Sequence, residues 1–147
     1  MLNDLHSPDL QMRLNASAHL LDARAVEPLL ALVSDMSAPN EARWRAVILL
    51  GWLGDAQAVE PLLALLTDAS WDVRNSAVWS LGMIGAAAAF DPLARVLHTS
   101  KDEQVPYIAA LMLIRLDAAR AHALLTGALG HSDESVQRIA RSALATF

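Results

Sequence analysis

Apolar residues recur along this chain at spacings of three and four, which is the periodicity of one face of an α-helix. Between residues 73 and 85, Val73, Ala77, Leu81 and Ile84 fall on one such face. A similar apolar stripe precedes them, formed by Leu62, Leu65 and Leu66. No segment shows the strict alternation of apolar and polar residues that predicts a half-buried strand. The pattern therefore predicts an all-α fold.

The helical segments are copies of two alternating sequence words. Residues 25–32 (AVEPLLAL) recur unchanged at 58–65 and more loosely at 90–96 and 121–125. The second word, VRNSAVWSLGMIG at 73–85, reads ARWRAVILLGWLG at 42–54, 31 residues earlier. Weaker copies of it begin at residues 12, 105 and 136. Self-similarity at a fixed period is typical of solenoids, in which each repeat buries its apolar face against the next.

Turn residues separate the words and predict the helix ends. Gly54 and Gly85 stand where a left-handed residue ends the helix of the second word. Asp55 can then accept hydrogen bonds from the free amides that open the next helix. Each following helix has a proline in its first turn or so, where a missing donor costs least: Pro28, Pro61 and Pro92.

We therefore expect an α-solenoid of stacked antiparallel helix pairs, with about four and a half repeats in a right-handed superhelix. One repeat domain accounts for residues 1–147, because no linker or low-complexity segment interrupts the pattern. The composition agrees, since the chain is 54% hydrophobic but only 5% aromatic. Closely stacked helices require such a core of small aliphatic residues.

The words Val-Arg-x-x-Ala-x-x-x-Leu-Gly-x-x-Gly and Gly-Asp-x-x-Ala-Val-Glu-Pro-Leu resemble the short HEAT-like repeats of the phycobilisome-lyase type. The resemblance covers nearly the whole chain and is strongest between residues 42 and 85. The period of about 31 is shorter than that of longer HEAT and armadillo repeats. The resemblance implies that the helix carrying the Val-Arg word lines a concave surface and that its variable positions point into the groove.

Carried onto this chain, those positions hold all four tryptophans and the only tyrosine. They step by four along each helix, so each set forms one stripe turned away from the Ala-Leu core. We call this set the aromatic face and expect it, with two neighbouring arginines, to bind a partner. Its residues are Trp44, Arg45, Ile48, Trp52, Trp71, Asn75, Trp79, Met83, Tyr107, Leu111 and Arg115.

The alternative is that these large side chains only fill gaps between successive helices. Small residues such as Ala46, Ala77 and Ala109 occupy the core positions of the repeat. An indole in their place would force neighbouring helices apart, at a cost of about 1–3 kcal/mol. Exposed aromatic patches usually mark interaction sites, and Trp and Tyr are enriched at interface hot spots.

Charge and composition exclude several classes of function. A net charge of −5 and a single lysine argue against binding nucleic acid. No uncharged apolar run reaches the length that spans a bilayer, and no signal peptide opens the chain. The absence of cysteine is compatible with the cytosol, so we expect a cytoplasmic protein. Arginine recurs at one position of the repeat, and its explanation is structural: an arginine and a turn aspartate bridge adjacent repeats. The residues are Arg13, Arg43 and Arg74 with Asp35 and Asp68.

Catalysis, a metal and a cofactor are not predicted. A HEAT-repeat enzyme family, deoxyhypusine hydroxylase, binds two irons through His-Glu dipeptides, but no histidine here precedes a glutamate. The histidines are scattered over different helices and turns, without a ligand pair at i and i+4: His6, His19, His98, His122 and His131. The repeat glycines have packing roles and form no phosphate loop: Gly51, Gly54, Gly82 and Gly85.

Two functional hypotheses remain. The first is a non-catalytic scaffold that binds a protein or peptide in the aromatic groove, with Arg45 and Arg115 pairing carboxylates. The second follows from the resemblance: a bilin lyase subunit or related tetrapyrrole-handling protein. A homo-oligomer is also possible, through the groove or through a C-terminal end that lacks a polar cap and presents Ile139, Leu144 and Phe147.

Overall fold

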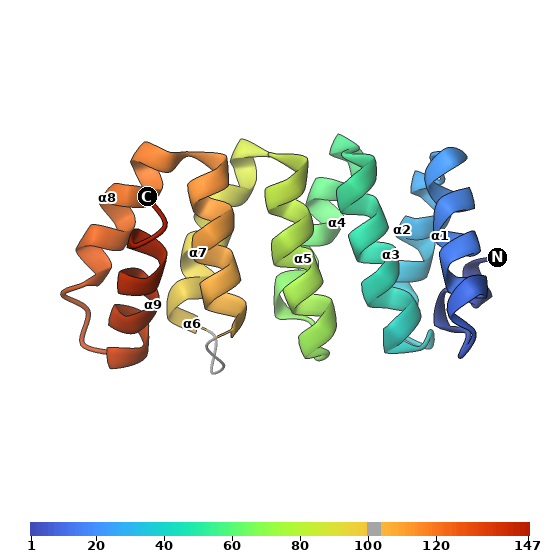
Figure 1. Ribbon diagram of the computed structural model, residues 1–147, viewed down its shortest axis with the longest axis horizontal. Helices are drawn as coiled ribbons and strands as arrows, with labels where there is room; N and C mark the ends of the chain where they lie inside the picture. The colour runs from blue at the N-terminus through green and yellow to red at the C-terminus, as the bar shows by residue number, and fades with distance from the viewer. Residues whose placement is uncertain (100–103) are drawn as a thin grey trace.

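The computed structural model describes residues 1–99 and 104–147, which contain helices and no strand. Consecutive helices run antiparallel and stack along one axis, with the termini at opposite ends (Figure 1). The 3-10 helices are labelled η. The elements are η1 Leu2–His6, α1 Leu10–Asp22, α2 Val26–Ser34, α3 Asn40–Leu53, η2 Ala56–Ala58, α4 Val59–Ala64, η3 Leu65–Thr67, α5 Trp71–Ile84, η4 Ala87–Ala89, α6 Phe90–Thr99, α7 Gln104–Leu116, α8 Ala118–Ala128 and α9 Glu134–Leu144.

The helices form two layers. Helices α1, α3, α5, α7 and α9 lie side by side in the first layer, and α2, α4 and α6 lie behind it (Figure 1). The even-numbered helices each pack against the next helix along the chain: α2 against α3, α4 against α5, α6 against α7 and α8 against α9. The predicted α-solenoid of antiparallel helix pairs is confirmed.

The first layer is the more closely packed. Helix α5 packs along both α3 and α7, whereas neighbouring helices of the second layer make few contacts. Glycine allows this close approach: a Cβ added at Gly51 would lie 2.9 Å from the Cα of Ser80, and one added at Gly82 would lie 2.6 Å from the Cβ of Met112. The backbones of the first-layer helices therefore approach each other most closely at these two glycines.

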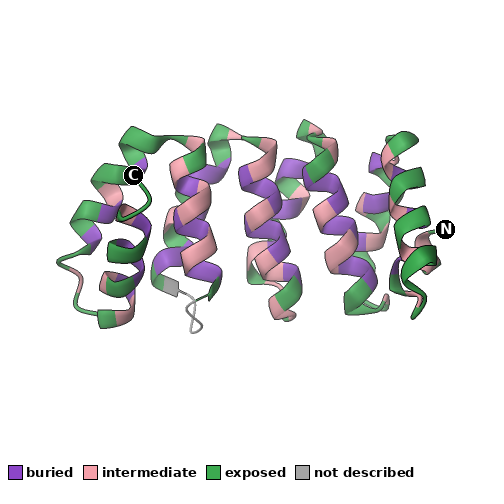
Figure 2. Cartoon of the chain, viewed as in Figure 1, coloured by how far each residue is buried: buried purple, intermediate pink, exposed green. Residues whose placement is uncertain are grey.

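The core lies between the layers and between neighbouring helices of the first layer. Val73, Ala77 and Leu81 are fully buried, as the periodicity predicted, whereas Ile84 near the helix end is half-buried. Ala46 and Ala109 are also fully buried, which confirms the small-residue core. Exposed residues gather on α1 and on α8, at the two ends of the stack (Figure 2).

The helix ends follow the predicted turn chemistry. Gly54 and Gly85 adopt left-handed backbone conformations, with φ of 67° and 77°. The Gly54 N–H donates to the Leu50 carbonyl, and the Asp55 carboxylate accepts from the Gln57 N–H at 2.9 Å. The prolines are confirmed in the first turns of α2, α4 and α6: Pro28, Pro61 and Pro92.

The turn between α1 and α2 has no glycine at its left-handed position. Arg24 takes that position instead, with φ of 48°. The Ala25 N–H donates to the Leu20 carbonyl and the Arg24 N–H to the Leu21 carbonyl, both at 3.0 Å, which is the Schellman arrangement. A side chain in this conformation costs about 1–2 kcal/mol relative to glycine.

One arginine–aspartate bridge between repeats is confirmed. The Arg43 guanidinium on α3 pairs with the Asp68 carboxylate, in the turn before α5, at 2.5 Å. The side chains of Arg43 and Asp68 are only 2% and 4% exposed. The prediction is wrong for Asp35, whose carboxylate accepts from the backbone N–H and hydroxyl of Ser37 in its own turn. Arg13 donates to carbonyls of the turn before its own helix.

Candidate binding face

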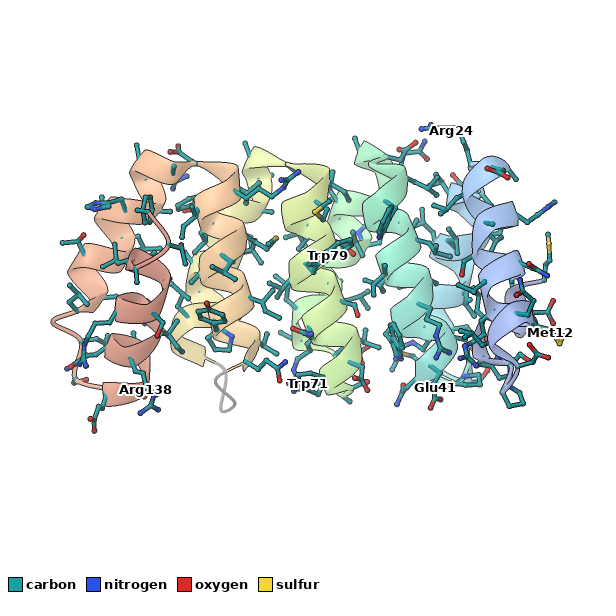
Figure 3. The ribbon with its side chains drawn as sticks, in the orientation of Figure 1. Met12, Arg24, Glu41, Trp71, Trp79 and Arg138 are labelled. Carbon is teal, nitrogen blue, oxygen red and sulfur yellow. The ribbon has the colours of Figure 1, made fainter. Side chains whose placement is uncertain are left out.

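The aromatic face lies on α3, α5 and α7 in the first layer. None of its eleven residues is buried: Trp52 and Arg115 are exposed, and the other nine are half-buried. Trp71 lies at the start of α5 and Trp79 beyond its middle, on the side of the first layer turned to the viewer (Figure 3). The predicted separation between core positions and outward positions on these helices is therefore seen.

Trp52 and Trp79 form a pair across the contact between α3 and α5. Their ring centroids lie 6.3 Å apart, with planes tilted by 38°. The Trp52 residue is 65% exposed. The backbones beneath the pair are held by the close approach at Gly51 and by the Ser80 hydroxyl, which donates to the Val47 carbonyl at 2.8 Å. The indole pair is thus presented on a rigid support.

The other aromatic residues of the face are partly engaged in packing. Trp44, Trp71 and Tyr107 pack against the hydrophobic core. These three residues therefore fill gaps between helices, as the alternative interpretation expects. The pattern placed all of the aromatic residues on equivalent stripes, and only the three-dimensional packing separates them.

Arg45 does not point freely into the face. Its guanidinium donates to the Leu5 carbonyl at 2.6 Å and lies 4.7 Å from the Trp44 ring centroid. The hydrogen bond to Leu5 joins α3 to η1. Burial, with a contribution from the nearby Arg13 cation, lowers the pKa of Arg45 below its ordinary value. A partner carboxylate would have to displace the Leu5 carbonyl to use this arginine.

Arg115 is exposed and keeps most of its donors available. Its Nε donates to the Gly82 carbonyl at 3.2 Å, which places the guanidinium beside the end of α5 that carries Met83. On α5, the Asn75 side-chain oxygen is buried and accepts no hydrogen bond from the described residues. An unsatisfied acceptor of this kind lowers stability, by about 1–3 kcal/mol.

A cavity of about 330 Å³ adjoins Tyr107, between α7 and α9. Its lining includes residues that we did not predict as part of the site: Gln104, Arg138, Ile139 and Ser142. The repeat register contains a signal for two of them, because Arg138 and Ser142 stand 31 residues after Tyr107 and Leu111. The outward stripe therefore continues onto α9 in polar form.

Metal ligands and membrane spans are not found in residues 1–99 and 104–147. No group of three or more His, Cys, Asp or Glu side chains there could hold a metal ion. His98 and His131 stack with centroids 4.9 Å apart, and the His131 Nδ1 accepts from the Asp133 N–H. No helix in these ranges is both long enough and apolar enough to span a bilayer.

A two-layer stack of antiparallel helix pairs, with repeat glycines in the closely packed layer, defines a helical-repeat protein. The family model for HEAT repeats matches residues 26–113. The chain belongs to the HEAT repeat family. The resemblance to the phycobilisome-lyase type of repeat is also supported by solved structures.

Among solved structures, the complex of CpcE and CpcF of phycocyanin lyase from Nostoc sp. PCC7120 superposes with a TM-score of 0.65 at 27% identity, covering 97% of this chain and 62% of that one. Human deoxyhypusine hydroxylase superposes with a TM-score of 0.67 at 19% identity, covering 97% of this chain and 59% of that one, and shares the fold alone. This chain thus spans about three fifths of both proteins.

A designed armadillo repeat protein in complex with the peptide (KR)4 superposes with a TM-score of 0.60 at 25% identity, covering 99% of this chain and 80% of that one. No curated protein matches the sequence of this chain. The comparisons establish a repeat solenoid. Since one such fold supports many functions, the function has to be argued from the face itself.

Proposed function

We propose that this chain is a non-catalytic scaffold that binds a protein or peptide partner on its aromatic face. The observation that carries the proposal is the indole pair, in which Trp52 is 65% exposed beside Trp79. Tryptophan is a large apolar side chain, and burying it against a partner removes apolar surface from water at about 25 cal/mol per Å². Rigidly held aromatic residues are the usual anchors of protein interfaces.

Two similar structures support a partner-binding role. One is a designed armadillo repeat protein bound to a peptide, and the other is a complex of two chains, CpcE and CpcF. In both cases a helical-repeat chain is found together with another polypeptide. The side-by-side arrangement of the first-layer helices also favours contact there, because a partner lying across this layer meets several helices at once (Figure 1).

The test is a comparative pull-down with the double variant Trp52→Ala, Trp79→Ala as one bait and wild type as the other. Met36→Ala, Leu129→Ala is the matched control, since both of its sites are exposed apolar residues outside the aromatic face. Proteins held by wild type and by the control, and lost from the tryptophan variant, support the proposal. Equal capture by all three baits contradicts it, provided that circular dichroism shows all three to be folded.

A second copy of this chain is one possible partner, and the same variants test it. Light scattering on wild type at high concentration then returns about twice the 15.8 kDa chain mass, whereas the Trp52→Ala, Trp79→Ala variant stays monomeric. A monomeric wild type assigns the face to a foreign partner.

The second candidate is a bilin lyase subunit or a related tetrapyrrole-handling protein. The similarity to the phycocyanin lyase complex over 97% of this chain favours it. An open tetrapyrrole could stack on the indole pair and pair one propionate with Arg115. Arg45 is less suited to a second propionate, because the Leu5 carbonyl already binds it. A change in bilin absorbance on mixing with wild type, lost in the tryptophan variant, would establish this function; an unchanged spectrum speaks for the scaffold.

A further inference from the structure

We infer that the partner presents an extended, polyproline II-like segment with an apolar residue and an acidic residue three positions apart. The segment docks on the part of the aromatic face formed by Trp52, Trp79, Met83 and Arg115, which we call the indole patch. This inference rests on the proposed function and specifies the chemistry of the partner.

The four residues of the indole patch are contiguous. Trp52 stacks on Trp79 across the α3–α5 contact, and Met83 follows Trp79 by one helical turn. The Arg115 Nε binds the carbonyl of Gly82, the residue next to Met83. A surface of two indoles and a thioether therefore ends in a guanidinium on α7.

Four of the other seven residues of the aromatic face are already engaged within the chain. Trp44, Trp71 and Tyr107 pack against the core, and Arg45 binds the Leu5 carbonyl. A partner gains less apolar burial from side chains that the fold has already partly covered. The indole patch contains both exposed residues of the face, Trp52 and Arg115, and is therefore its most accessible part.

The Arg115 guanidinium favours an acidic residue on the partner segment. Arg115 is exposed, and its planar fork of donors matches a carboxylate. The acidic residues near that end of the face have their own roles as helix caps: Asp55 accepts from the Gln57 N–H and Asp117 from the Arg120 N–H. Arg115 therefore gives the patch a cationic edge on the α7 side and an apolar edge on the α3 side.

The spacing across the patch selects the backbone conformation. Trp52, Met83 and Arg115 occupy equivalent positions on successive first-layer helices, so they form a row across the helix axes. Packed helices lie about 8–10 Å apart. A polyproline II helix rises about 3.1 Å per residue with three residues per turn, so its side chains repeat on one side about every 9 Å. One such repeat therefore places an apolar partner residue over Trp79 and Met83 on α5 and the acidic residue three positions away over Arg115 on α7.

The experiment is selection from a display library of random dodecapeptides on three immobilised proteins. These are wild type, Arg115→Gln and Arg120→Gln, each confirmed as helical by circular dichroism; Arg120 is an exposed arginine on α8, outside the aromatic face. On wild type and on Arg120→Gln we expect enrichment of peptides with an aromatic or aliphatic residue and an Asp or Glu three positions away, always on the same side. On Arg115→Gln the apolar preference should remain and the acidic preference should disappear.

One enriched peptide is then synthesised with its acidic residue and with the matching amide. Titration followed by tryptophan fluorescence should show about two- to fivefold weaker binding for the amide, because the ion pair is solvent-exposed. The difference should shrink with added salt and vanish on Arg115→Gln. Enriched peptides without an acidic preference, or with one that survives Arg115→Gln, overturn this inference and leave the scaffold proposal standing. Failure of wild type to enrich any sequence overturns the inference as well, and the pull-down then decides the proposed function separately.

Discussion

Replacing the buried Arg43 with methionine should destabilise the fold by about 3 kcal/mol, because it leaves the Asp68 carboxylate without its cation. The two side chains are 2% and 4% exposed, so water cannot replace the lost partner without opening the structure. Arg43 also donates to the Val33 carbonyl at 3.2 Å, which loses that bond as well. Methionine keeps most of the apolar stem of the arginine, so the loss mainly reports the charge and the hydrogen bonds.

A double-mutant cycle separates the pair from its surroundings. Asp68→Ala alone leaves a buried guanidinium and should also cost several kcal/mol. The double variant Arg43→Met, Asp68→Ala has no unpaired charge, so its loss should be smaller than the sum of the two single losses. We expect a coupling free energy of about 1–3 kcal/mol.

The pH dependence gives an independent check. Burial acts to raise the pKa of Asp68, but hydrogen bonds from Arg43 and from the Ser70 N–H outweigh burial and hold that pKa below its ordinary value. In wild type the stabilisation is therefore complete above the unfolded pKa of about 3.9 and is lost as the pH falls through the lower folded pKa. Without Arg43, only the Ser70 N–H and the Arg74 cation oppose burial, so the pKa of Asp68 should rise and protonation should relieve the buried charge. The stability deficit of Arg43→Met should therefore shrink as the pH falls from 7 toward 4.

Urea denaturation followed by circular dichroism at 222 nm measures all of these quantities. A loss below about 1 kcal/mol for Arg43→Met would refute the reasoning, since removing one partner of a buried ion pair is strongly destabilising. So would additive losses in the cycle, or a deficit that is the same at pH 7 and pH 4.

Two glycines and the left-handed Arg24 give further predictions, all measured by the same denaturation. Gly51→Ala should destabilise by about 1–3 kcal/mol, because its Cβ would lie 2.9 Å from the Cα of Ser80; an unchanged midpoint would show that α3 and α5 can separate freely. Gly127→Ala, on α8 where no atom lies within 4 Å of the added Cβ, should stabilise by about 0.5–1 kcal/mol, and a loss there would contradict the open space. Arg24→Gly should stabilise by about 1 kcal/mol by relieving the left-handed strain, and a destabilised variant would mean that the Arg24 side chain contributes more than its backbone costs.

Most of the fold follows from local rules that a sequence displays. Gly54 and Gly85 take the left-handed conformation, and Asp55 caps the next turn, because these residue types have few competing uses at such positions. The repeat also carries the layer assignment, since positions equivalent to Ala46 and Ala77 must be small for the helices to approach. The break of the α4 segment into a 3-10 turn at Leu65–Thr67 was not foreseen, because both helix types use the same residues.

The sequence pattern predicted which residues lie on the face, but not which of them are exposed and which are engaged in contacts within the chain. The stripe pattern places Trp44 and Trp52 alike, although only Trp52 is exposed. Arg45 turns toward Leu5 because η1 lies against α3, and that contact joins residues 40 positions apart. Asp35 was assigned to a bridge that Asp68 makes, because the pattern does not show that Ser37 satisfies the Asp35 carboxylate within the turn. Long-range packing decides these cases.

The unequal spacing of the two layers gives the molecule a direction in which it yields under load. When its ends are pulled apart, the close helix contacts of the first layer and the Ser80 hydroxyl bond resist separation, whereas the sparsely contacting helices of the second layer can move apart. Under a tensile force along an assembly containing this chain, the second layer, opposite the indole pair, should therefore take up most of the deformation.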